Sequence, residues 1–181
     1  MFRASNRRTD AFLLMLLASV SLSACNDEPA TATSSRPASQ AVTDACALLT
    51  ATEIEAATGI APGPPKDVSQ AQLPMCNWPT ADGSNPAFLT LMIGPSHNYT
   101  SYDDAMQKWA ESAADMGFPF EADDYQEVDG VGDVGAWMAE AGSLQAHTGT
   151  TMIQVMTEAA AGHDRLEAAR ELVRDVDARL P

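Results

Sequence analysis

The sequence predicts an α+β domain in which one antiparallel sheet of about five strands has helices packed on one face. Short strand patterns at residues 136–139, 144–147 and 151–157 are joined by glycine-containing turns, as in antiparallel hairpins. Three other segments carry apolar residues at helical spacing. The predicted order is helix, two strands, helix, three strands, helix. This order predicts adjacent antiparallel strands with helices covering them.

The domain begins near Asp44, and its first helix starts after Thr50. Thr50 and Glu53 have the spacing of a capping box, and Gly59 is suited to end the helix. Several prolines in residues 59–74 exclude regular structure and predict a loop.

Two more strands and two more helices complete the prediction. The strands lie at residues 76–78 and 88–93, with a turn of Gly, Asn and Pro between them. The second helix is capped by Ser101, carries an apolar stripe and ends at Gly117. The last helix begins at Asp164, with a glutamate three positions later.

An apolar run over residues 11–24 follows three arginines and has the length of a secretory signal rather than of a membrane span. It ends in Leu22-Ser23-Ala24-Cys25, which resembles the lipobox of bacterial lipoproteins. In that motif the cysteine is acylated and becomes the first residue of the mature protein. We therefore expect residues 1–24 to be a signal peptide and Cys25 to carry a lipid. A soluble secretory signal with a chance cysteine is the alternative.

Residues 25–43 are rich in Ala, Thr, Ser and Pro and predict a disordered tether, which leaves residues 44–181 as the single domain. The whole chain has a net charge of −15, and removal of residues 1–24 makes it −17, because three arginines and one aspartate are lost. So acidic a surface repels nucleic acid and anionic lipid headgroups. We expect no nucleic-acid partner, and attachment to the membrane only through the lipid. The expected location is the cell envelope, facing the periplasm or the cell exterior.

Lipidation of Cys25 would leave Cys46 and Cys76 as an even pair in an oxidising compartment. A disulfide between them would close a loop of about thirty residues and contribute about 3 to 4 kcal/mol. Metal ligation by the two cysteines is the less favoured alternative, because no histidine lies near them.

Gly130–Gly135 matches the glycine pattern of dinucleotide-binding proteins, but acidic residues crowd it and a hairpin follows it. We therefore predict a tight turn between strands. An EF-hand is excluded because Tyr125 and Ala136 would occupy positions that require carboxylates. A looser calcium site is the alternative to a solvated acidic loop.

No catalytic residue and no metal ligand is predicted. The three histidines show no zinc-ligand spacing, and no Gly-x-Ser-x-Gly is present. No cofactor is expected.

One sheet face is the candidate site for a ligand or partner. With Thr148-Gly149 as a two-residue loop, Leu144 pairs with Ile153, and alternate residues share a face. Trp137 then lies on the core side, and Met138 lies beside Met152. The predicted face consists of Met138, Gln145, His147, Met152, Gln154 and Met156. A copper site, or ordinary packing beneath a loop, is the alternative use of these residues.

Three short motifs follow the lipobox along the chain: Cys46-Ala47-Leu48-Leu49-Thr50, Cys76-Asn77-Trp78 and Gly130-Val131-Gly132-Asp133. Together they resemble a family of bacterial cell-envelope lipoproteins with a domain of unknown function, best represented in actinobacteria. The resemblance implies a bridged cysteine pair and an envelope location. It supplies no catalytic residues.

These observations favour a lipid-anchored, non-enzymatic module that binds an envelope protein, a peptide or a small ligand. The sheet face and the proline-rich loop at residues 59–74 are its candidate surfaces. A hydrolase whose site is assembled only in three dimensions, and a carrier of a small apolar ligand, are the alternatives. A histidine bonded to a serine or carboxylate in a concave pocket would favour the hydrolase, whereas an apolar patch rimmed by acidic residues would favour the binding module.

Overall fold

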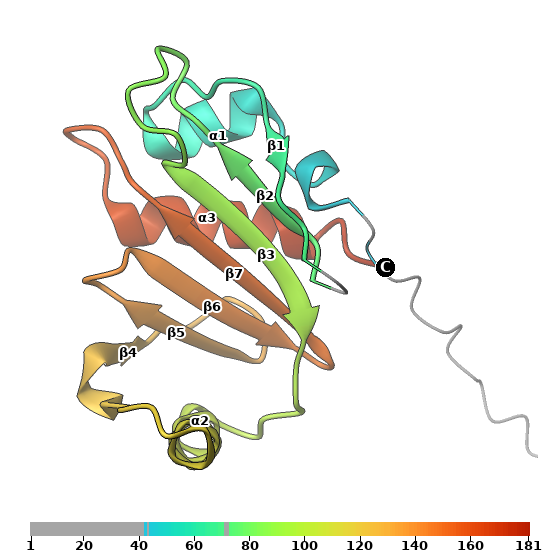
Figure 1. Ribbon diagram of the computed structural model, residues 1–181, viewed down its shortest axis with the longest axis vertical. Coiled ribbons are helices and arrows are strands. Elements are labelled where there is room, and N and C mark those ends of the chain that lie inside the picture. Colours follow the sequence, from blue (N-terminus) through green and yellow to red (C-terminus); the bar gives the residue numbers. More distant parts are fainter. Residues whose placement is uncertain (1–41, 43, 71–72) are drawn as a thin grey trace, which may run out of the picture. The chain divides into compact units, whose positions relative to one another are not determined.

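A computed structural model describes residues 42, 44–70 and 73–181. They form an α+β domain with a single antiparallel sheet, which confirms the predicted class (Figure 1). The sheet has seven strands, in the order β1-β2-β3-β7-β6-β5-β4. The predicted signal peptide, the lipidation of Cys25 and nearly all of the predicted tether fall outside the described residues.

The strands are β1 (Lys66–Asp67), β2 (Met75–Trp78), β3 (Leu89–Pro95), β4 (Tyr125–Glu127), β5 (Val134–Met138), β6 (Ser143–Thr148) and β7 (Thr151–Thr157). The helices are α1 (Ala51–Thr58), α2 (Tyr102–Met116) and α3 (Arg165–Asp177), with 3-10 turns η1 (Ala45–Ala47) and η2 (Ala122–Asp124). The sheet has two more strands than predicted, and these are its two edge strands, β1 and β4. β1 falls in the predicted loop and β4 in the acidic stretch, and both are too short to show alternation.

The predicted helix caps are present. Thr50 and Glu53 form a complete capping box at the start of α1. The hydroxyl of Ser101 accepts a hydrogen bond from an amide in the first turn of α2. Gly59 and Gly117 end these two helices in the left-handed conformation that glycine adopts without strain, at φ 70° and 74°.

One face of the sheet carries the main core. Leu91, Leu144 and Val155 point to this face and are fully buried with Leu172 and Val173 of α3. Helix α3 lies against β7 and β6, and α1 lies against α3. Figure 1 shows α3 behind these strands. Burial of aliphatic side chains between the helix and the sheet is the main source of stability.

Helix α2 packs on the opposite face, which corrects the prediction that all helices share one face. Ala105 and Met106 of α2 are buried with Val134 and Ala136 of β5. These two β5 residues alternate with Trp137, which belongs to the core on the α3 side. The side of β5 that faces away from α3 is therefore apolar too, and α2 covers it.

The β6–β7 hairpin differs from the prediction by two residues in register. Thr148 pairs with Thr151, so the loop is Gly149-Thr150, and Leu144 lies opposite Val155 rather than Ile153. Because side chains alternate with period two, an even shift leaves every residue on its predicted face. Met138 lies opposite Ser143, and Ser143 lies opposite Met156, so Met138 is not beside Met152.

Four arginines hold α3 to the rest of the domain. Each guanidinium donates to a main-chain carbonyl: Arg165 to Thr157, Arg170 to Asp129, Arg174 to Gly130 and Arg179 to Leu48. Arg179 also pairs with Glu53 of α1, and this pairing, together with the hydrogen bond from the Thr50 amide, lowers the pKa of the Glu53 carboxyl to about 2. Most of the basic side chains of the domain thus lie on the α3 side of the sheet and are engaged in hydrogen bonds there. None of the described helices is long and apolar enough to cross a membrane.

The predicted disulfide between Cys46 and Cys76 is present and ties η1 to β2 across 30 residues. Its Cys76 end is completely buried in the core, between the sheet and the segment that precedes α1. The bond therefore fixes the start of the domain to the sheet.

The double variant Cys46→Ser, Cys76→Ala is expected to lower the free energy of unfolding by about 3 to 4 kcal/mol, because the unfolded chain regains the entropy of an open loop. Urea unfolding of the variant and of the native protein measures the difference. Dithiothreitol should destabilise the native protein and leave the variant unchanged; equal stabilities without reductant would contradict the expectation.

Candidate functional site

The six predicted site residues all lie on the sheet face opposite α3. In the register of β5, β6 and β7, Gln145 lies opposite Gln154, and His147 lies opposite Met152. Directly opposed residues of antiparallel strands point to the same side. Met138 and Met156 both lie opposite Ser143, one on each side of it.

The same face continues over β3 and β2, whose residues are not among those predicted from the sequence. Met92 lies opposite both Gln154 and Met75, and Thr90 lies opposite Met156 and Asn77. The buried Cys76 and Trp78 alternate with Met75 and Asn77, so the period-two pattern of β2 carried this signal. The pairing of β3 with β7, which places these residues next to β7, leaves no local signal in the sequence.

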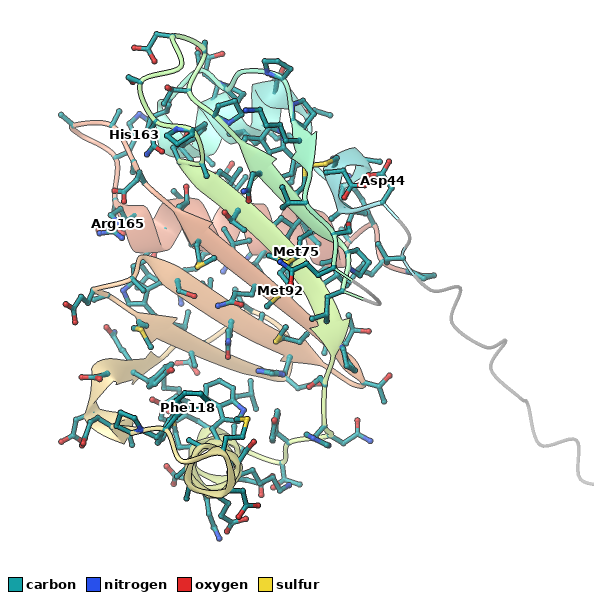
Figure 2. The ribbon with its side chains drawn as sticks, viewed as in Figure 1. Asp44, Met75, Met92, Phe118, His163 and Arg165 are labelled. Carbon is teal, nitrogen blue, oxygen red and sulfur yellow. A yellow bond between two sulfur atoms is a disulfide. The ribbon has the colours of Figure 1, made fainter. Side chains whose placement is uncertain are left out.

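We call this surface the methionine face. It consists of Met75, Asn77, Thr90, Met92, Met138, Ser143, Gln145, Met152, Gln154 and Met156. All five of its methionines are partly exposed. In Figure 2, Met75 and Met92 lie over the strands on the side away from α3.

The polar groups of the methionine face bond largely to one another. The Gln154 amide donates to the Ser143 hydroxyl at 2.9 Å, and the Thr90 hydroxyl donates to the Asn77 side-chain oxygen at 2.8 Å. None of its ten residues is charged. The surface is therefore neutral and rich in flexible, polarisable thioethers, which adapt to differently shaped apolar partners.

An aromatic cluster holds α2 over the β5–β6 end of this face. The Trp109 indole donates to the Tyr99 hydroxyl at 2.9 Å, and the Trp109 and Tyr125 rings lie 5.6 Å apart. The ring of His147 is 4.8 Å from that of Tyr99 and 5.3 Å from that of Trp109. His147 is thus enclosed by aromatic rings, and only 4% of it is exposed.

The hydrogen bonds of His147 fix its tautomer. Its Nδ1 lies 2.6 Å from the Ser96 Oγ, and this Oγ also lies 2.8 Å from the carbonyl oxygen of His97. Because a serine hydroxyl has one proton and a carbonyl only accepts, both contacts are hydrogen bonds only when Nδ1–H donates to Ser96 and Ser96 donates to His97. Among the described residues, the buried Nε2 has no partner. Burial, aided by the nearby His97, lowers the pKa of His147 to about 4.

This arrangement opposes activation of Ser96 as a nucleophile. A general base must accept the serine proton, and here that proton is directed to the His97 carbonyl. No carboxylate in the described part of the chain bonds to Nε2 to orient the ring. The Ser96–His147 bond instead anchors the segment between β3 and α2 to β6.

The residues weighed for copper do not meet at one point. Met138 and Met156 share a row with Ser143, whereas His147 and Met152 share a row four residues away along β7. The Met152 side chain leans over β3, where a Cβ added at Gly94 would lie 2.9 Å from its Cε. The six predicted residues therefore share one face, as expected, but Met138 and Met152 are not neighbours on it.

The glycine-rich segment is a turn, as predicted. Gly130 and Gly132 have φ values of 75° and 62°, and the chain continues into β5 rather than into a helix. The Asp133 carboxylate accepts a hydrogen bond from the Gly149 amide at 2.8 Å. Within the described ranges, no group of three or more His, Cys, Asp and Glu side chains is placed to hold a metal ion.

The proline-rich loop is tied to the edge of the sheet. The Gly63 amide donates to the Pro79 carbonyl at 2.7 Å, and β1, within the loop, pairs with β2. The loop thus extends the sheet, which leaves the methionine face as the stronger candidate surface.

Replacement of His147 by asparagine is expected to flatten the dependence of stability on pH between about 6.5 and 4. The folded-state pKa of about 4 lies below the ordinary value of 6.5. The unfolded chain therefore binds the extra proton in this interval, and stability falls as the pH falls through it. Over this interval the shifted pKa of His147 lowers the free energy of unfolding by about 3 kcal/mol in total. Urea unfolding at several pH values measures it, and equal slopes for the two proteins would contradict the expectation.

No protein-family model matches the chain, and neither a curated protein nor a solved structure does.

Proposed function

We propose that this chain is a lipid-anchored, non-enzymatic binding module of the bacterial cell envelope, and that the methionine face is its binding surface. The observation that carries the proposal is the composition of this face. The solvent side of an antiparallel sheet normally alternates polar residues with the core, but here five partly exposed methionines occupy it. Exposed apolar side chains gathered on one surface among polar residues are typical of interaction sites.

The envelope location is supported by the sequence of the leader and by the disulfide. Leu22-Ser23-Ala24-Cys25 has the pattern of a lipobox behind an apolar run. The Cys46–Cys76 bond is typical of proteins outside the cytoplasm. The resemblance to envelope lipoproteins of unknown function is part of this proposal, and the net charge of −15 disfavours nucleic acid as a partner.

The hydrolase alternative has one observation in its favour, the hydrogen bond between Ser96 and His147. Its weight is small, because the proton of Ser96 is directed to a main-chain carbonyl and the ring is enclosed by Tyr99 and Trp109. A binding module accounts better for an uncharged face that is rich in methionine.

Lipidation predicts that the mature chain begins at Cys25 and carries acyl groups. Mass spectrometry of protein isolated from bacterial membranes should find the amino-terminal peptide heavier by the mass of the lipid. The variant Cys25→Ser should be recovered from the soluble fraction or as unprocessed precursor. A mature chain that begins elsewhere with an unmodified residue would contradict the anchor.

A photoreactive residue such as benzoylphenylalanine in place of Gln154 should form adducts in the envelope of the bacterium that makes the protein, because Gln154 lies in the middle of the methionine face. The matched control is the same residue in place of Glu171, which is exposed on α3. The changes Met75→Gln and Met92→Gln together should reduce the adduct. Equal yields at positions 154 and 171, or none at 154, would contradict the proposed surface.

A further inference from the structure

We infer that the occupant of the methionine face is a cationic amphipathic helix, whose apolar stripe packs on the methionines and whose basic residues meet the acidic end of the face. This inference rests on the proposed function and adds the chemical class of the partner. Three observations carry it: the distribution of charge, the exposed apolar residues beside α2, and the dimensions of the open surface.

The end of the sheet occupied by α2, η2 and β4 is strongly acidic. Its only lysine, Lys108, pairs with Asp104 at 2.9 Å. The arginines are used on the opposite face, where they hold α3. The exposed carboxylates of this end are those of Asp103, Glu111, Asp115, Glu121, Asp123, Asp124 and Glu127. Residues 101–127 contain no basic residue other than Lys108, which pairs with Asp104.

Part of this charge borders the methionine face directly. Glu127 of β4 lies opposite Ala136, which lies opposite Gln145, so the three side chains point to the same side as the methionines. Burial raises the pKa of the Tyr102 hydroxyl, and the charges of Glu127 and Asp103 raise it further. The charges of one carboxylate on β4 and one on α2 thus both act on a phenol of α2.

Two large apolar side chains lie in the same acidic region. Met116, at the end of α2, is 63% exposed, and Phe118, just beyond it, is 64% exposed. Figure 2 shows Phe118 at the α2 end of the sheet. Apolar anchors among carboxylates suit a partner that is itself both apolar and basic.

The open surface has the length of a short helix. The two central strands β3 and β7 each contain seven residues, and a strand of that length spans about 23 Å. A helix of about 15 residues has the same length. On the other face α3, a helix of 13 residues, covers β7 and β6. Methionine-rich surfaces commonly receive the apolar side of amphipathic helices, because thioethers adjust to the shape of the partner.

Other occupants are less complementary to the negative charge at the acidic end of the face. A second copy of this chain would bring two acidic surfaces together, since each carries a net charge of −15. A helix with lysines or arginines on its polar side complements the acidic end instead.

The test uses the chain from residue 25 onward, the mature form that the proposed function implies, with Cys25→Ser, so that neither an acyl group nor the apolar run over residues 11–24 competes for the apolar surface. The probe is a labelled 15-residue peptide of leucine and lysine with leucines in one helical stripe. Two control peptides have the same residues in shuffled order, or glutamate in place of every lysine. Fluorescence anisotropy should show that the first peptide binds. The shuffled peptide should bind at least about tenfold more weakly, and the acidic peptide should not bind.

Two sets of variants assign the binding to the surface. The double change Met75→Gln, Met92→Gln removes apolar surface without adding charge. It should lower the affinity for the cationic peptide about tenfold. Asp123→Asn, Asp124→Asn and Glu127→Gln together should also weaken it and make its affinity less sensitive to salt. The matched control removes three carboxylates from α1 and α3, by Glu55→Gln, Glu171→Gln and Asp177→Asn, and should leave binding unchanged. Thermal unfolding establishes that each variant is folded.

The outcomes separate this inference from the proposed function. If the acidic peptide binds as well as the cationic one, or if the control variant weakens binding as much as the acidic-end variant, the cationic class is wrong. Concentration-dependent dimers that are lost with Met75→Gln and Met92→Gln would assign the face to a second copy and overturn the inference. An adduct at position 154 without binding of the cationic peptide would overturn this inference alone. Absence of both would overturn the proposed function as well.

Discussion

The pairing of β3 with β7 is the constraint on which the rest of this domain depends. It joins the strands before α2 to the hairpins after it and makes one seven-stranded sheet of them. Leu91 and Val155 meet in this pairing and are completely buried on the side of α3. On the other side the same pairing brings Met92 beside Gln154. The core and the candidate site are therefore two faces of one set of hydrogen-bonded strands.

The two faces of the sheet also divide the charge of the protein. The arginines of α3 donate to main-chain carbonyls, and Arg179 pairs with Glu53, so positive charge is concentrated where it holds the helix in place. The exposed carboxylates of α2, η2 and β4 lie at one end of the other face. The result is an uncharged, methionine-rich surface next to a strongly acidic edge. Such a combination favours partners that are apolar and positively charged.

Helix α2 shows how a polar group is accommodated on the apolar side of a sheet. His147 points to the methionine side but is enclosed by Tyr99 and Trp109, and its one short hydrogen bond is to Ser96. Burial keeps the imidazole neutral. The geometry explains why a serine and a histidine in contact need not form a nucleophilic pair: the direction of each proton decides the role.

The sequence by itself determined the class of the fold, the capped helices, the glycine turn and the disulfide, because each depends on local spacing or on a count of cysteines. It also predicted correctly which residues of β6 and β7 share a face, since an even error in register does not change sides. The tertiary structure alone decided that β3 lies beside β7, that α2 covers the face opposite α3, and that Met75 and Met92 extend the site. These features arise from contacts between segments far apart in the chain, and such contacts have no periodic pattern from which they can be read.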